Sequence, residues 1–331
     1  MTLRRILLVK TSSMGDVVHN FPVVSDLSVR FPTAEIDWVV EEAFAPLVRL
    51  HAMVREAIPV TVRRWRRSLF APATWREIAA LRRKLQARFY DAVIDTQGLL
   101  KSALLVACAP GRKYGLDWRS SREPIGWFYH RTFAIPWDRH AVERNRALAA
   151  LALGYEVSGP ANYAIRVPPA AVEALRGCVP AHLAQWLTRP YAVLLHSSAG
   201  SQKLWSEDSW AQLGAALHAR GLSSLLPFGS STEQNRSERL ADRIAGALVP
   251  PRLPLDRLAA LLAGAQLVVG VDTGLAHLSA ALGRPTVGIY CATDPRATGV
   301  YAAAHAANVG DGRSPPSVEQ VLAAADRLLR T

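Results

Sequence analysis

The sequence predicts an α/β protein with two doubly wound parallel-sheet domains. Its 331 residues are too many for one compact core and suit two domains. Half of the residues are hydrophobic (50%) and 20% are charged, which excludes a mainly disordered chain. Short apolar runs alternate with amphipathic segments along the chain, and this alternation is typical of parallel strands joined by crossover helices.

The first domain is expected over residues 1–165. It opens with an apolar run of the kind found in parallel strands that are buried on both faces, and Pro32 ends the helical pattern that follows. We expect strands at 5–9, 36–40 and 92–95 and helices at 16–30, 74–88, 99–107 and 140–153.

A proline-rich stretch separates the two domains. Prolines punctuate residues 160–190, and we interpret 166–190 as a linker around a short helix near 170–177. A second domain is expected over 191–315. Its strands are expected at 191–195, 224–228, 267–271 and 286–290, and its helices at 206–219, 231–246, 255–264 and from 274. No strand follows the last helix, within 316–331, so we expect it to pack back on the first domain.

The net charge of +12 is concentrated in the first half of the chain. Residues 1–165 hold 24 Lys and Arg against 15 Asp and Glu, whereas residues 166–331 hold 15 against 12. An anionic partner should therefore meet the first domain. Nucleic acid, an anionic membrane surface and a phosphorylated substrate all fit this charge.

The cysteines and the hydropathy pattern indicate a cytoplasmic protein. Cys108, Cys178 and Cys291 are too far apart for a disulfide framework or a CxxC zinc site. The apolar run near the amino terminus is shorter than a signal peptide requires, and no stretch is long enough to span a bilayer.

The turn after the first expected strand, Lys10-Thr-Ser-Ser-Met-Gly-Asp16, is the first candidate for chemistry. Ligands of open parallel sheets gather at the carboxyl ends of strands, where helix amino termini attract anions. It is neither a GxGxxG nor a P-loop motif. Asp16 is either a helix-capping carboxylate or a general base that takes the proton of a sugar hydroxyl.

The segment Val271-Asp-Thr-Gly-Leu-Ala-His277 repeats this arrangement in the second domain. Thr273 can cap the helix, and Gly274 allows an anion close to the backbone amides, so phosphate binding is favoured. His277, one turn into the helix, is equally consistent with a structural histidine.

Two further turns of the second domain carry charged side chains. Lys203 lies on a polar loop and is either a solvated lysine or a point charge for a diphosphate. Trp205 is expected to pack beneath that loop. Glu233 lies in the first turn of a helix, where it either caps the helix or accepts the hydroxyls of a ribose.

Basic residues cluster in the first domain. Residues 62–88 contain nine Lys and Arg and the single acid Glu77, interleaved with tryptophan. Such clusters serve nucleic acid or phosphorylated lipids at an anionic surface, although part of the charge belongs to solvated helix faces.

Together these segments resemble the ADP-heptose:lipopolysaccharide heptosyltransferases, glycosyltransferase family 9. The resemblance rests on 10–16, Asp95-Thr-Gln-Gly-Leu-Leu-Lys101-Ser, Lys203-Leu-Trp205 and 271–277, in the family's order and across essentially the whole chain. Any one of them is a weak signal, but all of them in order are specific. The resemblance implies a GT-B fold, in which two Rossmann-like domains face each other across a central cleft.

The resemblance also implies a reaction. L-glycero-D-manno-heptose would pass, with inversion, from ADP-L-glycero-β-D-manno-heptose to a Kdo hydroxyl of Kdo2-lipid A, without a metal or other cofactor. Asp16 would be the general base. The donor would be bound by Lys203, Glu233, Asp272, Thr273, Gly274, Leu275 and His277, and the acceptor by Ser13, Gly15, Arg63, Arg64, Arg66, Lys101 and Arg122. One departure stands out, because the family often has an arginine before the phosphate lysine and residues 199–202 supply none.

The expected partners are ADP-heptose, Kdo2-lipid A and the anionic cytoplasmic face of a Gram-negative inner membrane, and not nucleic acid. The nearest alternative is a family member that acts on a later core sugar. A nucleic-acid or membrane binder without catalysis would explain the charge but none of the turn segments. A sugar-nucleotide epimerase would need a nicotinamide site, which the absence of GxGxxG disfavours.

Overall fold

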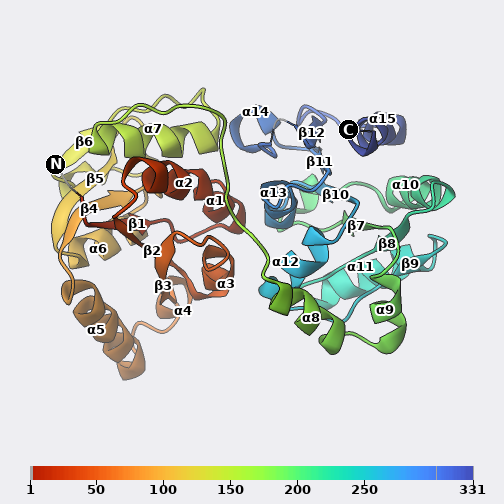
Figure 1. Ribbon diagram of the computed structural model, residues 1–331, viewed down its shortest axis with the longest axis horizontal. Coiled ribbons are helices and arrows are strands. Elements are labelled where there is room, and N and C mark those ends of the chain that lie inside the picture. The colour runs from red at the N-terminus through yellow and green to blue at the C-terminus, as the bar shows by residue number, and fades with distance from the viewer. Residues whose placement is uncertain (1–2, 303, 331) are drawn as a thin grey trace. The chain divides into compact units, whose positions relative to one another are not determined.

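The computed structural model describes residues 3–302 and 304–330. The chain divides into two compact units, Met1–Ala164 and Ile165–Thr331, each with its own parallel sheet (Figure 1). The boundary lies just before the expected linker. Residues 166–190 contain two helices that belong to the second unit, so this segment is not an extended connection.

The first unit contains a six-stranded sheet in the order β3-β2-β1-β4-β5-β6. Its strands are β1 (Arg5–Val9), β2 (Glu35–Glu41), β3 (Val54–Val60), β4 (Tyr90–Asp95), β5 (Gly111–Leu116) and β6 (Arg131–Phe133). Its α-helices are α1 (Met14–Val18), α2 (Phe21–Arg30), α3 (Ala45–Val48), α4 (Val62–Trp65), α5 (Pro72–Gln86), α6 (Leu100–Cys108) and α7 (Ala141–Leu153). The strand order reverses between β1 and β4, as in a doubly wound fold.

The alternation of side chains along β1 fills a core on both faces of the first sheet. Leu7 and Val9 join a buried cluster with Leu85 of α5 and Val106 of α6. The intervening Ile6 is also fully buried, because neighbouring side chains of a strand point to opposite faces. Helices α2 and α7 pack together on the other side of the sheet (Figure 1).

The helix expected over 16–30 is two helices. Helix α1 ends at Val18, and α2 restarts at Phe21 with Pro22 in its first turn. A proline has no N–H to donate, and its ring clashes with the preceding turn of a helix. The break confines Asp16 to a short helix directly after β1.

The second unit repeats this topology, with the order β12-β11-β10-β7-β8-β9. Its strands are β7 (Tyr191–Leu195), β8 (Ser223–Leu225), β9 (Ala247–Leu248), β10 (Leu267–Val271), β11 (Thr286–Ile289) and β12 (Ala306–Val309). Its helices are α8 (Pro169–Cys178), α9 (Ala181–Trp186), α10 (Glu207–Ala219), α11 (Ser231–Ala241), α12 (Leu255–Ala263), α13 (Gly274–Ala281), α14 (Pro295–Thr298) and α15 (Val318–Leu329). Two elements are shorter than expected, because β8 stops before Pro227 and α11 stops at Ala241.

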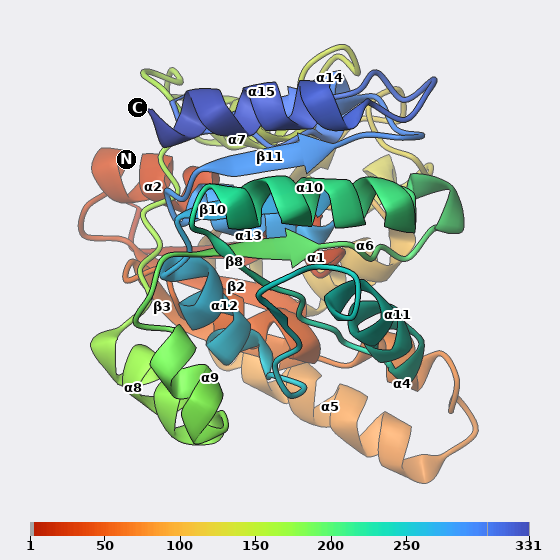
Figure 2. The ribbon, with the colours of Figure 1, turned by 90° about the vertical axis from the view of Figure 1, so that its right-hand side faces the viewer.

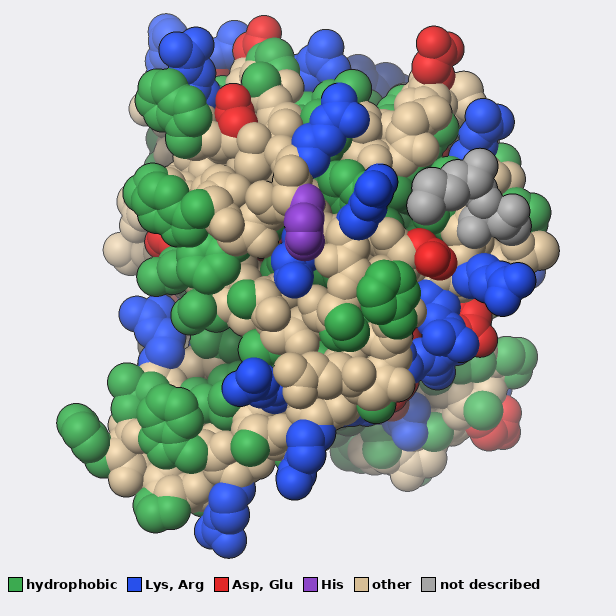
Figure 3. Space-filling model, turned by 90° about the vertical axis from the view of Figure 1, so that its left-hand side faces the viewer, with side chains coloured by type: hydrophobic (Ala, Val, Ile, Leu, Met, Phe, Trp, Pro, Cys, Tyr) green, Lys and Arg blue, Asp and Glu red, His purple; other side chains and the backbone are tan. Residues whose placement is uncertain are grey.

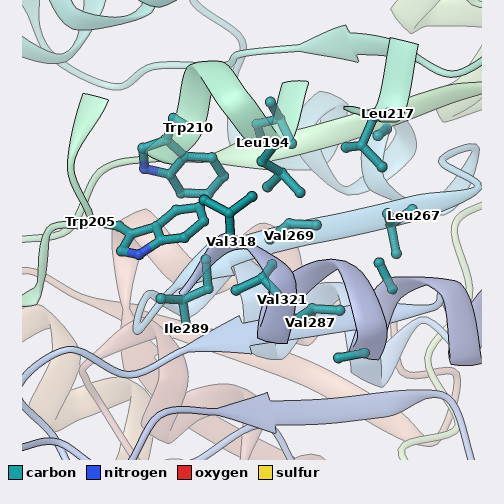
Figure 4. Close-up of a cluster of buried hydrophobic side chains, with 14 of the residues drawn as sticks. Leu194, Trp205, Trp210, Leu217, Leu267, Val269, Val287, Ile289, Val318 and Val321 are labelled. Atoms are coloured by element: carbon teal, nitrogen blue, oxygen red, sulfur yellow. The ribbon is translucent and has the colours of Figure 1, made fainter. Parts of the chain in front are cut away.

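The C-terminal helix α15 packs against the sheet of the second unit. Its buried Val318 and Val321 join a core cluster with Ile289 and Trp205 (Figure 4). The Trp205 Nε1 donates a hydrogen bond to the Pro316 carbonyl, 2.9 Å away. The helix runs alongside β11 (Figure 2), where its apolar face covers the sheet.

Candidate functional site

All four motif segments lie at the points where the strand order reverses. In the first unit, Lys10–Asp16 follows β1, and Asp95 ends its neighbour β4. In the second unit, the loop at 197–203 follows β7, and Asp272 follows its neighbour β10. Ligands of doubly wound sheets bind in the crevice outside the carboxyl ends of such strands. Each unit therefore has one candidate site.

The two segments of the first unit are joined by direct hydrogen bonds. The Gln97 Oε1 accepts bonds from the amides of Thr11 at 3.0 Å and Ser12 at 3.1 Å. The Lys101 Nζ donates to the Ser12 Oγ at 2.6 Å. Gln97 and Lys101 thus fix the backbone that carries Asp16.

Asp95 holds the turn that presents Gln97. Its Oδ1 accepts bonds from the amides of Gln97 at 2.8 Å and Gly98 at 3.2 Å, and its Oδ2 accepts one from the Tyr129 hydroxyl at 2.7 Å. Gly98 has φ +70°, a conformation that side chains disfavour. Burial raises the pKa of Asp95, and the hydrogen bonds from Tyr129 and the turn oppose that rise. Asp95 is therefore a structural residue of this site.

Asp16 lies in the first turn of α1 and is half-buried. Its Oδ2 accepts bonds from the Ser13 amide at 2.7 Å and the Ser13 Oγ at 2.9 Å. The capping interaction is thus present, and it orients the carboxylate. Within the described residues, no hydrogen bond to Oδ1 is seen, so this oxygen is available to accept a hydrogen bond or a proton from a bound molecule.

Two lysines, Lys10 and Lys101, lie within the electrostatic influence of Asp16. The buried Lys10 Nζ donates to the Thr96 carbonyl at 2.7 Å, and burial lowers the pKa of Lys10 while the charges of Asp16 and Asp95 oppose this. Burial also lowers the pKa of Lys101, with Arg63 acting in the same direction. These cations make the carboxyl end of the first sheet a favourable place for an anion.

The expected acceptor arginines differ in their surroundings. The charges of Arg63 and Arg66 act on Lys101, and the charge of Arg122 acts on Lys10, so these three share the field of the site. Arg64 instead forms a 2.7 Å ion pair with Glu77. Figure 3 shows a face on which Lys and Arg are frequent and Asp and Glu are few.

Sequence reasoning missed two members of the first site. The buried Glu41, at the end of β2, accepts a bond from the Arg63 amide at 3.2 Å and thereby holds the start of α4. Arg144 of α7 adds a further positive charge near Lys10. Neither residue lies in a recognisable motif, so the sequence offered no signal for them.

Asp272 is the centre of the second unit's site. Its Oδ2 accepts bonds from the Lys203 Nζ at 2.6 Å and the Thr293 Oγ1 at 2.9 Å, and the His277 Nε2 lies 3.7 Å from Oδ1. Burial raises the pKa of Asp272, but the hydrogen bonds from His277 and Lys203 outweigh it and hold the pKa well below its usual range. Lys203, expected as a diphosphate ligand, is thus paired with a carboxylate in this structure.

The amino end of α13 follows Asp272 directly. Thr273 is the N-cap residue, but its side chain makes no capping hydrogen bond, so the expected cap is absent. The Ser198 Oγ donates to the Asp272 carbonyl at 2.7 Å and ties the loop after β7 to this turn. The first turn of α13, which includes Gly274 and Leu275, presents amides at the carboxyl end of β10.

Glu233 caps α11. Its Oε2 accepts a bond from the Gly229 amide at 2.7 Å, and its own amide donates to the Ser230 Oγ at 3.3 Å. The capping arrangement places a carboxylate at the end of the polar turn after β8. Trp205, as expected, is buried beneath its loop.

Two general features of the chain bear on function. No group of three or more His, Cys, Asp or Glu side chains within residues 3–302 and 304–330 is arranged to hold a metal ion. In the same part of the chain, no helix combines the length and apolarity needed to cross a membrane.

Known proteins are similar to this chain in sequence and in fold. The family model described as glycosyltransferase family 9 (heptosyltransferase) matches residues 78–322. Lipopolysaccharide heptosyltransferase 1 of Escherichia coli K12 is 44% identical over 306 residues, which cover 90% of this chain and 91% of that protein.

Solved structures show the same arrangement within each chain. The E. coli heptosyltransferase WaaC with ADP has a TM-score of 0.83 and 40% identity, over 98% of both chains. WaaC with ADP-2-deoxy-2-fluoro heptose has a TM-score of 0.81 and 40% identity, over 98% of this chain and 99% of that one. This similarity confirms the GT-B class expected from the sequence.

Proposed function

The chain belongs to glycosyltransferase family 9, the heptosyltransferases, and from that membership we propose that it transfers L-glycero-D-manno-heptose from ADP-heptose to a Kdo hydroxyl of Kdo2-lipid A. The reaction would build the inner core of lipopolysaccharide. The observation that carries this proposal is the extent of the similarity, 44% identity over 90% of the chain to a lipopolysaccharide heptosyltransferase 1.

The second unit would bind the donor. A diphosphate placed at the first turn of α13 would meet helix amides and the ammonium of Lys203. Lys203 would then exchange the Asp272 carboxylate, 2.6 Å away, for phosphate oxygens. Asp272 would keep its bonds to Thr293 and His277 and could accept heptose hydroxyls, while Glu233 would accept those of the ribose.

The first unit would bind the acceptor and remove its proton. Arg63, Arg66, Arg122 and Lys101 would bind the acidic acceptor, and Ser13 and Gly15 would line its position at α1. The Asp16 Oδ1 would take the proton of the attacking hydroxyl, while the Ser13 bonds to Oδ2 keep the carboxylate oriented. Attack at the anomeric carbon opposite the leaving ADP inverts its configuration.

We propose that this transfer needs no metal. Fixed positive groups at a leaving diphosphate can stabilise its developing charge, which is the role usually given to a bound cation. Lys203 and the α13 amides supply such groups. The basic surface of the first unit would hold the enzyme at the anionic inner face of the membrane that carries its acceptor.

The deciding experiment measures ADP release from ADP-heptose with Kdo2-lipid A in the presence of a chelator. We expect acceptor-dependent release by the wild type and a loss of about 10²–10⁴-fold in Asp16→Asn, which keeps the shape of the side chain but cannot accept the proton. ADP binding, measured by calorimetry, should be unchanged. Glu42→Gln, an exposed carboxylate of the same unit, is the matched control and should keep full activity.

Other outcomes would change the assignment. Release only with an already heptosylated acceptor would make the chain an enzyme of a later core sugar. Activity that disappears with the chelator and returns with a divalent cation would refute metal independence. No release with either acceptor from folded protein that still binds ADP would refute the proposed transfer.

A further inference from the structure

The second unit contains a cavity that the proposed reaction does not use. Its volume is about 410 Å³. It is lined by Ile165, Arg166, Val167, Val172, Leu175, Arg176, Leu187, Tyr191, Ala260, Ala263, Gly264, Leu282 and Arg284. Tyr191 is the first residue of β7, and Arg284 lies just before β11, so the cavity is at the amino ends of the strands. Lys203 and Asp272 follow the opposite, carboxyl ends.

One wall of the cavity is apolar. Val172 and Leu175 line it from α8, and Ala260 and Ala263 line it from α12, which packs against α8 (Figures 1 and 2). The Tyr191 hydroxyl donates to the Leu261 carbonyl at 2.7 Å, so it is already satisfied and the ring faces a ligand as an apolar surface. An aliphatic or aromatic body would replace water here at a gain in free energy.

The charges that line the cavity are all positive. Arg166 and Arg176 are exposed, Arg284 is half-buried, and the lining contains no Asp or Glu. None of the three arginines has a carboxylate partner among the residues that the structure describes. The Arg284 Nε is buried without a hydrogen-bond partner, and the charge of Arg284 opposes the rise that burial causes in the pKa of Tyr191. An uncompensated guanidinium therefore faces the cavity beside an apolar wall.

We propose that this cavity binds an amphiphilic anion, a molecule with one carboxylate or phosphate head and an apolar body. The head would sit between the arginines, whose planar guanidinium groups match both anions. The body would lie along α8 and α12. A cavity of about 410 Å³ falls in the size range of small-molecule sites. A sugar or a free nucleotide would leave its hydroxyls facing aliphatic side chains, so the lining disfavours both.

The test uses decanoate and decyl phosphate as probes, with decanol and inorganic phosphate as the molecules that lack one half of the recognition. Calorimetry on the full chain, with ADP present to fill the donor site, should detect both anionic probes and neither control molecule. The relative affinity of the two anionic probes then identifies the preferred head group.

Substitutions test whether the anionic probes bind in this cavity. Arg176→Gln with Arg284→Gln should weaken binding about tenfold or more, because charged hydrogen bonds are lost. Ala263→Leu, which fills the cavity and keeps every charge, should weaken it by a similar factor. Arg252→Gln, an exposed arginine outside the lining, is the matched control and should change it less than about twofold. ADP binding by each variant verifies that the second unit is folded.

Two results would overturn the proposal. One is the absence of binding by either anionic probe to wild-type protein that binds ADP. The other is binding that survives both Ala263→Leu and the double arginine substitution, since the probe would then occupy some other surface.

Discussion

Lys203 makes an ion pair with Asp272, although the proposed role of Lys203 is to bind the diphosphate of the donor. The pair joins two groups that are only partly exposed, at 29% and 13% of their side chains. Its attraction is therefore less screened than that of a surface pair. Asp272 also accepts a hydrogen bond from Thr293 and lies 3.7 Å from the His277 Nε2, so the lysine can move to phosphate without leaving a buried carboxylate alone.

Replacing Lys203 should therefore weaken nucleotide binding. We expect Lys203→Met to lower the affinity for ADP about tenfold or more, because a charge-assisted contact to the diphosphate is lost. Calorimetry with ADP measures this affinity. Lys101→Met is the control, since this lysine belongs to the first unit and bonds to Ser12. Equal ADP affinities for the wild type and Lys203→Met would remove Lys203 from the donor site.

Asp16, Lys203 and Asp272 could be selected as candidate site residues from the sequence, because they are charged residues on turns that follow strands. A doubly wound sheet brings such turns together at one edge. Their partners were not foreseeable. Gln97 and Thr293 contact the site through hydrogen bonds whose geometry depends on where each side chain reaches. The pairing of Arg64 with Glu77 was hidden for the same reason, since a count of charges does not say which are neutralised.

At the scale of single elements, α15 shows how packing determines where a helix goes. Its buried face includes Val321, which is fully buried in the core with Ile289 and Trp205, while Leu329 at its end is 36% exposed. The Ser317 Oγ accepts a bond from the Gln320 amide at 3.3 Å, and the Ser317 amide donates to the Gln320 Oε1 at 2.9 Å. This capping box fixes where the helix starts.

Truncation of Val321 should destabilise the second unit. We expect Val321→Ala to lower the free energy of unfolding by roughly 2 kcal/mol, from lost burial and the cavity left behind. Leu329→Ala removes more atoms from a more exposed position and should cost less. Urea denaturation followed by tryptophan fluorescence compares them, because Trp205 and Trp210 lie in the same core. An equal loss in both variants would contradict this placement of α15.

Strands with apolar runs were predictable from sequence, and strands of more polar composition were not. Strands β1, β4, β7, β10 and β11 each contain a run of buried apolar residues, because helices cover both of their faces. Strand β3 lies at an edge and contains Arg55, Glu56 and Pro59, and a proline is tolerated there because an edge has unpaired positions. Because β3 is polar in composition, a search for apolar runs does not find it, and the same is true of β5.

At the scale of the whole molecule, each unit contains a buried histidine whose pKa is lowered so that it stays neutral. His51 is 1% exposed in the first unit and His196 is 0% exposed in the second. Burial lowers the pKa of each from 6.5 to about 4, and for His196 the charge of Arg236 adds to this. The ring nitrogens are satisfied by neutral partners, such as Ser25 at 3.1 Å from His51 and Ser237 at 2.8 Å from His196.

These histidines should make both units sensitive to acid. Between pH 6.5 and about 4 the unfolded chain protonates both side chains and the folded chain does not, so stability falls as the pH falls. Each histidine can contribute roughly 3 kcal/mol across that window. Urea denaturation at pH 7, 6 and 5 should show this loss. His51→Asn and His196→Asn should each flatten the pH dependence, whatever their effect on stability at pH 7, and the exposed His182→Asn should not. If both buried-site variants kept the slope of the wild type, other groups would have to cause the acid sensitivity.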